Sequence, residues 1–156
     1  MLFRSLSIPE NARILNLDSE AETILVTGET VSEKRKAAFK DRSIRVLETP
    51  VKNGRINLSL LMSRLADIGI TSLLIEGGSR VIASALHARV VDKVCFFYAP
   101  KILGGDDGVP ICSGPGPDFM RECISIRDTE VHRFGEDVMI QGYIDKPKPG
   151  KGIQTE

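Results

Sequence analysis

Short apolar runs alternate with charged, amphipathic segments in the first part of the chain. Residues 12–16 and 23–28 are brief runs rich in aliphatic side chains, and we predict a strand at each. Residues 31–41 have the charge patterning of a helix whose lysines and arginine face solvent. Residues 43–49 have the composition of a further strand, which Pro50 ends. The pattern therefore predicts strand, strand, helix and strand in this order.

A helix with one apolar face is predicted for residues 57–70. Asn57 suits the N-cap, and Gly69 suits the position just after the last helical turn. The apolar residues at three- and four-residue spacing are Leu58, Leu61, Met62, Leu65 and Ile68. This spacing places them on one face, so we expect the helix to pack on a core.

A second strand-and-helix pattern follows directly. Residues 72–76 are a continuous apolar run, typical of a strand covered on both faces. Helical spacing returns from Ser79, and residues 91–100 form another apolar run that ends at Pro100. Alternating strands and helices predict an α/β fold with a mixed, mostly parallel sheet and helices on both faces.

The carboxyl-terminal part of the chain has a different pattern. Residues 101–118 are rich in glycine and proline, which predicts a long loop. Residues 123–134 and 137–144 have the composition of two strands joined by a tight turn at Gly135. We therefore expect an antiparallel hairpin at one edge of the sheet.

Length and composition narrow the functional class. A chain of 156 residues and 17.1 kDa suits one domain, which we assign to residues 1–144, and the polar residues 145–156 are expected to form a flexible tail. The 21 basic residues balance 21 acidic ones, which argues against binding to nucleic acid or to an anionic membrane. No apolar stretch suits a signal peptide or a bilayer span, so we expect a cytoplasmic protein.

The cysteines and the paired aspartates indicate no metal site. Cys95, Cys112 and Cys123 form no CxxC pair, and an odd number so widely spaced suggests reduced thiols. Cys95 lies within an apolar run and is expected in the core. Asp106 and Asp107 lie in a glycine-rich loop, where adjacent acids are more often solvated than bound to a metal.

The residues with the clearest chemistry lie at the end of the predicted strand 72–76 and directly after it. They are Glu76, Gly77, Gly78 and Ser79. Beyond the carboxyl end of a parallel strand, glycines allow a phosphate to approach the N–H groups of the next helix, and a serine can cap that helix or bond the phosphate. A carboxylate there can hold a donor-rich ring or a ribose. The alternative is a tight turn with a solvated acid, and because the segment is neither GxGxxG nor a Walker A motif, spacing alone leaves both open.

Residues 73–105, LLIEGGSRVIASALHARVVDKVCFFYAPKILGG, also resemble a known family. The order of strand, EGG, helix, VVDKV and APKILGG is similar to the C-terminal reductase domain of the bacterial riboflavin-biosynthesis bifunctional deaminase/reductase, and IPENARIL with TILVTG resembles an upstream part of that domain. The resemblance implies a dihydrofolate-reductase-like fold and a homodimer. It also implies NADPH-dependent reduction of 5-amino-6-(5-phosphoribosylamino)uracil to the ribitylamino product.

Carried over by position, the resemblance assigns roles to individual residues. It implies that Glu76 contacts the substrate. The residues that it implies for the NADPH phosphates are Gly77, Gly78, Ser79, Arg80, Val81, Ile82, Ala83 and Ser84. It also implies a cis peptide bond between Gly77 and Gly78. Lys101 is a candidate either for a phosphate contact or for a solvated loop position. The segment LFRS, residues 2–5, departs from the strand ending in Asp-Ser that the family usually has there, and Ser5 is the substitute for its cofactor-contacting serine.

The chain departs from the family pattern in ways that leave two functions open. The zinc signature of the family's deaminase domain is absent, which excludes deamination. The family's reductase domain begins with a further segment that has no counterpart in this chain, so we expect an incomplete cleft and an exposed strand edge. The two functions are an NADPH-dependent pyrimidine reductase and a truncated, non-catalytic nucleotide-binding or assembly module of the same fold. Dihydrofolate reductase itself is disfavoured, because its pterin-binding carboxylate lies on an early strand that is missing here.

Overall fold

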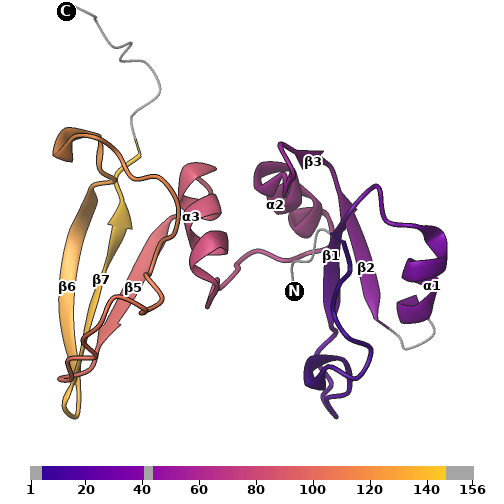
Figure 1. The fold of residues 1–156 in the computed structure, drawn as a ribbon, viewed down its shortest axis with the longest axis horizontal. Coiled ribbons are helices and arrows are strands. Elements are labelled where there is room, and N and C mark those ends of the chain that lie inside the picture. The colour runs from indigo at the N-terminus through magenta and orange to yellow at the C-terminus, as the bar shows by residue number, and fades with distance from the viewer. Residues whose placement is uncertain (1–4, 41–43, 147–156) are drawn as a thin grey trace, which may run out of the picture. The chain divides into compact units, whose positions relative to one another are not determined.

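The computed structural model describes residues 5–40 and 44–146, and the chain divides into two compact units, Met1–Leu73 and Leu74–Glu156 (Figure 1). The elements of the first unit are η1 (Arg13–Leu15), β1 (Ile24–Gly28), α1 (Glu33–Lys40), β2 (Arg45–Thr49), β3 (Val51–Lys52), β4 (Arg55–Ile56) and α2 (Leu58–Asp67). Those of the second unit are α3 (Ser79–His87), β5 (Lys93–Tyr98), η2 (Met120–Glu122), β6 (Ile126–Phe134) and β7 (Asp137–Ile144). The described residues contain no helix that is long and apolar enough to cross a bilayer.

The first unit is built on a parallel strand pair. β1 and β2 run in parallel, with Ile24 opposite Arg45 and Gly28 opposite Thr49. Figure 1 shows α1 and α2 on opposite sides of this pair. The buried core cluster consists of Leu6, Ile8, Leu25, Phe39 and Ile44. The predicted parallel pair and its helices are therefore confirmed.

Lys36 ties α1 to β2 inside this unit. The residue is only 3% exposed, and its Nζ lies 2.7 Å from a carboxylate oxygen of Glu33 and 2.7 Å from one of Glu48. Hydrogen bonds to these two carboxylates raise the pKa of Lys36 above its usual value. The prediction that all the lysines of this helix face solvent is therefore wrong for Lys36, which is buried because two carboxylates pair with it.

Both predicted ends of α2 are confirmed. The Asn57 side chain accepts a hydrogen bond from the N–H of Leu60 at 3.1 Å. Gly69 has a φ of +83°, and the N–H of Ile70 donates to the carbonyl of Leu65 at 3.0 Å, as in a Schellman motif. The buried residues of the helix are Leu58, Leu61 and Leu65.

Two short segments of the first unit differ from prediction. The prediction of a strand at residues 12–16 is wrong, because this segment forms the short 3-10 helix η1. The side-chain amide of Asn16 donates to the carbonyl of Ala12 at 2.9 Å. The small hairpin of β3 and β4 was not predicted. Its turn has Asn53 and Gly54 at φ of +50° and +71°, and an Asn-Gly pair is a strong hairpin signal.

The apolar run 72–76 forms no strand, contrary to prediction. Leu73 and Leu74 are 51% and 77% exposed, and the segment pairs with none of the described strands. An apolar run becomes a strand only if a neighbour accepts and donates its backbone hydrogen bonds. The α/β class is confirmed, but the mostly parallel sheet is wrong: the described sheets are the parallel β1–β2 pair, the antiparallel β3–β4 pair and an antiparallel sheet in the order β5-β7-β6.

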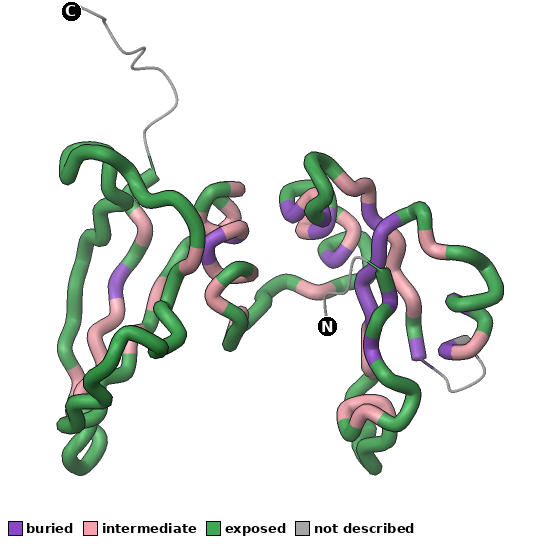
Figure 2. Tube along the Cα trace, viewed as in Figure 1, coloured by how far each residue is buried: buried purple, intermediate pink, exposed green. Residues whose placement is uncertain are grey.

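The second unit contains the predicted carboxyl-terminal hairpin. β6 and β7 pair in an antiparallel manner around Gly135, which has a φ of +63°, and β7 also pairs with β5. Most of this sheet is exposed or half-buried (Figure 2). Cys95 is exposed on it, so its predicted place in the core is wrong, since no described element covers its side of β5. Residues 147–156 of the predicted tail lie outside the described residues.

Candidate functional site

The start of α3 is shaped by Gly78. This residue is the N-cap, with φ of +75° and ψ of +102°, a conformation that side-chain-bearing residues rarely adopt. Its carbonyl accepts hydrogen bonds from the N–H of Val81 at 2.8 Å and of Ile82 at 3.0 Å. The chain can therefore turn into the helix within one residue, and the helix begins at Ser79 as predicted.

Open space lies beside this turn. A Cβ atom built on Gly77 would meet no heavy atom within 4 Å, and Glu76, Gly77 and Gly78 are all exposed. The first N–H groups of a helix have no acceptor within it and carry a partial positive charge. The turn therefore offers room and hydrogen-bond donors to an anionic group.

Two features of this turn differ from the prediction: the peptide bond between Gly77 and Gly78, and the role of Ser79. The described residues contain no cis peptide bond, so the expected cis bond between Gly77 and Gly78 is not observed, and the positive φ of Gly78 makes the turn instead. Ser79 does not cap the helix, because it is already helical and no side chain bonds at the N-cap. Its hydroxyl accepts a hydrogen bond from the hydroxyl of Ser113.

The other predicted cofactor residues lie further along α3. Arg80 is exposed, and Val81 and Ile82 are half-buried. Ala83 is buried, and the Ser84 hydroxyl donates to the carbonyl of Arg80 at 2.8 Å. The structure thus brings Ser79 to Ile82 together in the first helical turn and places Ala83 and Ser84 in the second.

Glu76 and the loop residues have few partners. No ion pair of the described residues includes Glu76, whose carboxylate lies directly before the turn. Lys101, Asp106 and Asp107 are exposed in the connection between β5 and β6. Across residues 5–40 and 44–146, no group of three or more histidine, cysteine or acidic residues is placed to hold a metal ion.

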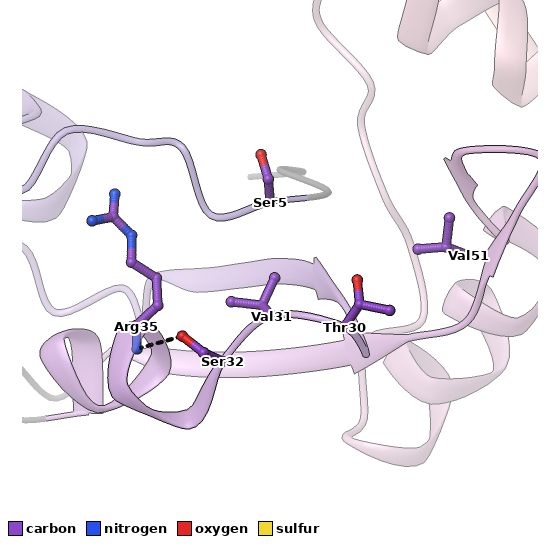
Figure 3. Close-up of a pocket in the computed structure, with 6 residues that line it drawn as sticks. All are labelled: Ser5, Thr30, Val31, Ser32, Arg35 and Val51. Carbon is purple, nitrogen blue, oxygen red and sulfur yellow. Dashed lines mark hydrogen bonds between the residues drawn. The ribbon is translucent and has the colours of Figure 1, made fainter.

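A second candidate lies in the first unit, in an open pocket of about 660 Å³ (Figure 3). It is formed where the chain leaves the carboxyl end of β1 and enters α1. Its lining residues are Ser5, Thr30, Val31, Ser32, Arg35 and Val51. Figure 3 shows the side chains of Thr30, Val31 and Arg35 pointing to the side on which Ser5 lies.

Arg35 links this pocket to the core. Its Nε and Nη2 atoms donate to the carbonyl of Leu6 at 3.2 and 3.1 Å, and its backbone N–H donates to the Ser32 hydroxyl at 3.4 Å. No ion pair joins Arg35 to a carboxylate among the residues described. A guanidinium together with three hydroxyl groups is a donor set suited to an oxyanion.

Sequence reasoning found only part of this pocket. Ser5 is among the candidates named from the sequence, whereas Arg35 is assigned there to a solvated helix face and Thr30 and Ser32 have no predicted role. The signal that could have found them is their position, because ligands bind beyond the carboxyl ends of parallel strands and residues 23–28 and 43–49 were predicted to be such strands.

The family follows from comparison with known proteins. The model of the RibD C-terminal domain matches residues 2–140. The chain belongs to the RibD C-terminal domain family. The reductase-domain resemblance of the segment around Glu76 is thereby confirmed at the level of the family.

Individual members of the RibD C-terminal domain family show how far the similarity extends. The chain is 33% identical over 133 residues to the 2,5-diamino-6-ribosylamino-4(3H)-pyrimidinone 5′-phosphate reductase of Methanothermobacter thermautotrophicus, covering 85% of this chain and 59% of that relative. It is 29% identical to the riboflavin biosynthesis protein RibD of Bacillus amyloliquefaciens, covering 97% and 39%. The chain therefore spans about two-fifths to three-fifths of the length of these relatives.

A solved structure confirms the fold. The pyrimidine reductase-like protein of Corynebacterium diphtheriae superposes with a TM-score of 0.69 at 18% identity, over 94% of this chain and 60% of that protein. At this identity the likeness concerns the fold alone. The chain therefore has the mixed α/β fold of RibD reductase domains.

Proposed function

We propose that the chain is an NADPH-dependent pyrimidine reductase of riboflavin biosynthesis. Its substrate is 5-amino-6-(5-phosphoribosylamino)uracil, and its product carries a ribitylamino side chain. The match of residues 2–140 to the RibD C-terminal domain is the observation that carries this proposal. A relative named as a reductase of a ribosylaminopyrimidine phosphate supports the type of reaction.

The residues at the start of α3 fit the cofactor. NADPH bound there would supply the hydride that reduces C1′ of the ring-opened ribose imine, with the proton for the nitrogen coming from solvent. Open space beside Gly77 can take the pyrophosphate, and the N–H groups of Ser79 and Arg80 with the Ser79 hydroxyl serve as donors to it. The predicted cofactor residues Gly77 to Ser84 are retained in this proposal, with the first helical turn nearest to the phosphates.

Glu76 is proposed to bind the substrate. Its exposed carboxylate has no ion-pair partner among the described residues and directly precedes the glycine turn. A carboxylate accepts strong hydrogen bonds from the N–H groups of an aminopyrimidine or from ribose hydroxyls. Glu76 thus orients the substrate, while the cofactor carries the redox chemistry.

The pocket in the first unit is proposed to take a phosphate group. Arg35 and the hydroxyls of Ser5, Thr30 and Ser32 form a donor set suited to a phosphate monoester. Both NADPH and the proposed substrate carry such a group. The pocket therefore serves binding, and no chemical step is assigned to it.

Glu76→Gln tests the substrate contact. The amide keeps the size of the side chain but loses its charge, so kcat/KM for the ribosylaminopyrimidine should fall about ten- to hundredfold, while NADPH affinity stays the same. Steady-state assays of NADPH oxidation measure the first, and calorimetry the second. Glu122→Gln, at an exposed acid in the same unit, is the matched control. An equal effect of the two substitutions would overturn the role of Glu76.

The protein is further proposed to act as a homodimer in the cytoplasm. The sheet of β5, β7 and β6 exposes Phe97 and Phe134 on one face in the single chain, and the centroids of the two rings are 6.2 Å apart. Contiguous exposed apolar surface is typical of an interaction site. Sedimentation equilibrium should give twice the chain mass of 17.1 kDa. A mass of one chain at assay concentration would contradict the dimer.

A further inference from the structure

The long connection between β5 and β6 touches α3 through one hydrogen-bonded residue. Every residue from 99 to 125 is exposed except Ser113, which is half-buried. Its N–H donates to the backbone carbonyl of Ser79 at 3.3 Å, and its hydroxyl donates to the Ser79 hydroxyl. No other described residue of this connection has a backbone hydrogen bond to α3. Ser113 therefore holds the connection at the first residue of the helix.

The hydroxyl pair allows Ser79 to act as a donor. A hydroxyl has one proton to donate and two lone pairs to accept with. In the arrangement in which Ser113 donates to Ser79, the proton of Ser79 is left for a third partner. An accepted hydrogen bond also polarises the O–H group, which then donates more strongly to a third partner. The O–H group of Ser79 lies beside the N–H groups at the start of α3, where an anionic oxygen is the complementary acceptor.

We propose that Ser113 is a positioning residue for the cofactor, holding the Ser79 hydroxyl as a donor to a phosphate oxygen of NADPH. This inference rests on the proposed function, because it deepens the site at the start of α3. The same contact couples the connection of residues 99–125 to cofactor binding, since an occupied Ser79 keeps Ser113 in place. Ser113 itself touches no substrate and takes no part in the chemistry.

The test compares NADP⁺ affinity of four chains by calorimetry: wild type, Ser113→Ala, Ser79→Ala and the double variant. Loss of one neutral hydrogen bond should weaken NADP⁺ binding by roughly two- to tenfold in Ser113→Ala. If Ser113 acts through Ser79, Ser113→Ala should have no further effect once Ser79 is alanine. In the full reaction the KM for NADPH should rise while kcat is unchanged.

Two further variants distinguish loss of the Ser113 hydroxyl from a general loss of stability. Ser113→Thr keeps the hydroxyl and should restore binding, and Ser125→Ala, at an exposed serine of the same connection, should leave it unchanged. Thermal unfolding of each variant reports whether it is folded. Equal NADP⁺ affinity of Ser113→Ala and wild type, or additive effects in the double variant, would overturn this inference alone. Failure of the folded wild type to bind NADP⁺ would overturn the proposed function as well.

Discussion

Gly78→Val should weaken NADPH binding at least tenfold. Gly78 has a φ of +75°, and a β-branched side chain in that region costs about 1–3 kcal/mol. The valine would relieve this strain by moving the backbone, which misaligns the N–H groups that open α3, and its methyl groups would lie beside Val81, whose Cγ2 is 3.6 Å from the position of a new Cβ. Calorimetric titration with NADPH measures the loss.

Gly116→Val is the matched control for this substitution. Gly116 lies in the same unit, where an added Cβ meets no atom within 4 Å and no positive φ is required. This variant should bind NADPH as the wild type does. Wild-type affinity in a folded Gly78→Val chain would show that the cofactor phosphates do not lie at the start of α3.

Phe39→Ala should lower the free energy of unfolding of the first unit by about 3–5 kcal/mol. Phe39 is 0% exposed and packs in the core cluster with Leu6, Leu25 and Ile44. Without the ring, the free energy gained by transferring it from water into the core is lost. A cavity also remains, which the helix and strands can only partly fill. Urea unfolding followed by circular dichroism measures the change.

Leu60→Ala provides the comparison within the same unit. Leu60 is 45% exposed on α2, so its truncation should change the free energy of unfolding by less than about 1 kcal/mol. A loss equal to that of Phe39→Ala would mean that the core of the first unit is not organised around α1, β1 and β2 as described.

Elements fixed by local patterns could be predicted from the sequence. The cap at Asn57, the glycine at Gly69 and the apolar spacing between them define α2, and both capping interactions are present. The same holds for β1, for α3 and for the hairpin around Gly135, whose signals lie within a few residues of the elements.

Elements that depend on distant partners could not be predicted in this way. The run at residues 72–76 has the composition of a buried strand, but composition does not supply the neighbouring strand that its backbone needs. Cys95 lies in an apolar run, yet its burial depends on what covers that face of β5. The small hairpin at Asn53 and Gly54 is different, because its Asn-Gly turn signal is local and present in the sequence.

Some residues of the candidate site could be predicted from local sequence, and others could not. The glycines before α3 and the start of the helix at Ser79 are local features, and the sequence predicts them. Ser113 lies 34 residues further along, in a loop without periodicity, so only the structure brings its hydroxyl to Ser79. The pocket of Ser5 and Arg35 likewise joins residues from separate segments of the first unit.

Turnover by the 156-residue chain decides between a reductase and a non-catalytic module. The chain is incubated with NADPH and the phosphorylated ribosylaminopyrimidine, in its deaminated and its still-aminated form, and the product is identified by mass spectrometry. We expect a product that has gained two hydrogen atoms for each NADPH oxidised. NADPH binding without any such product would contradict a reductase and would support a non-catalytic nucleotide-binding module of the same fold.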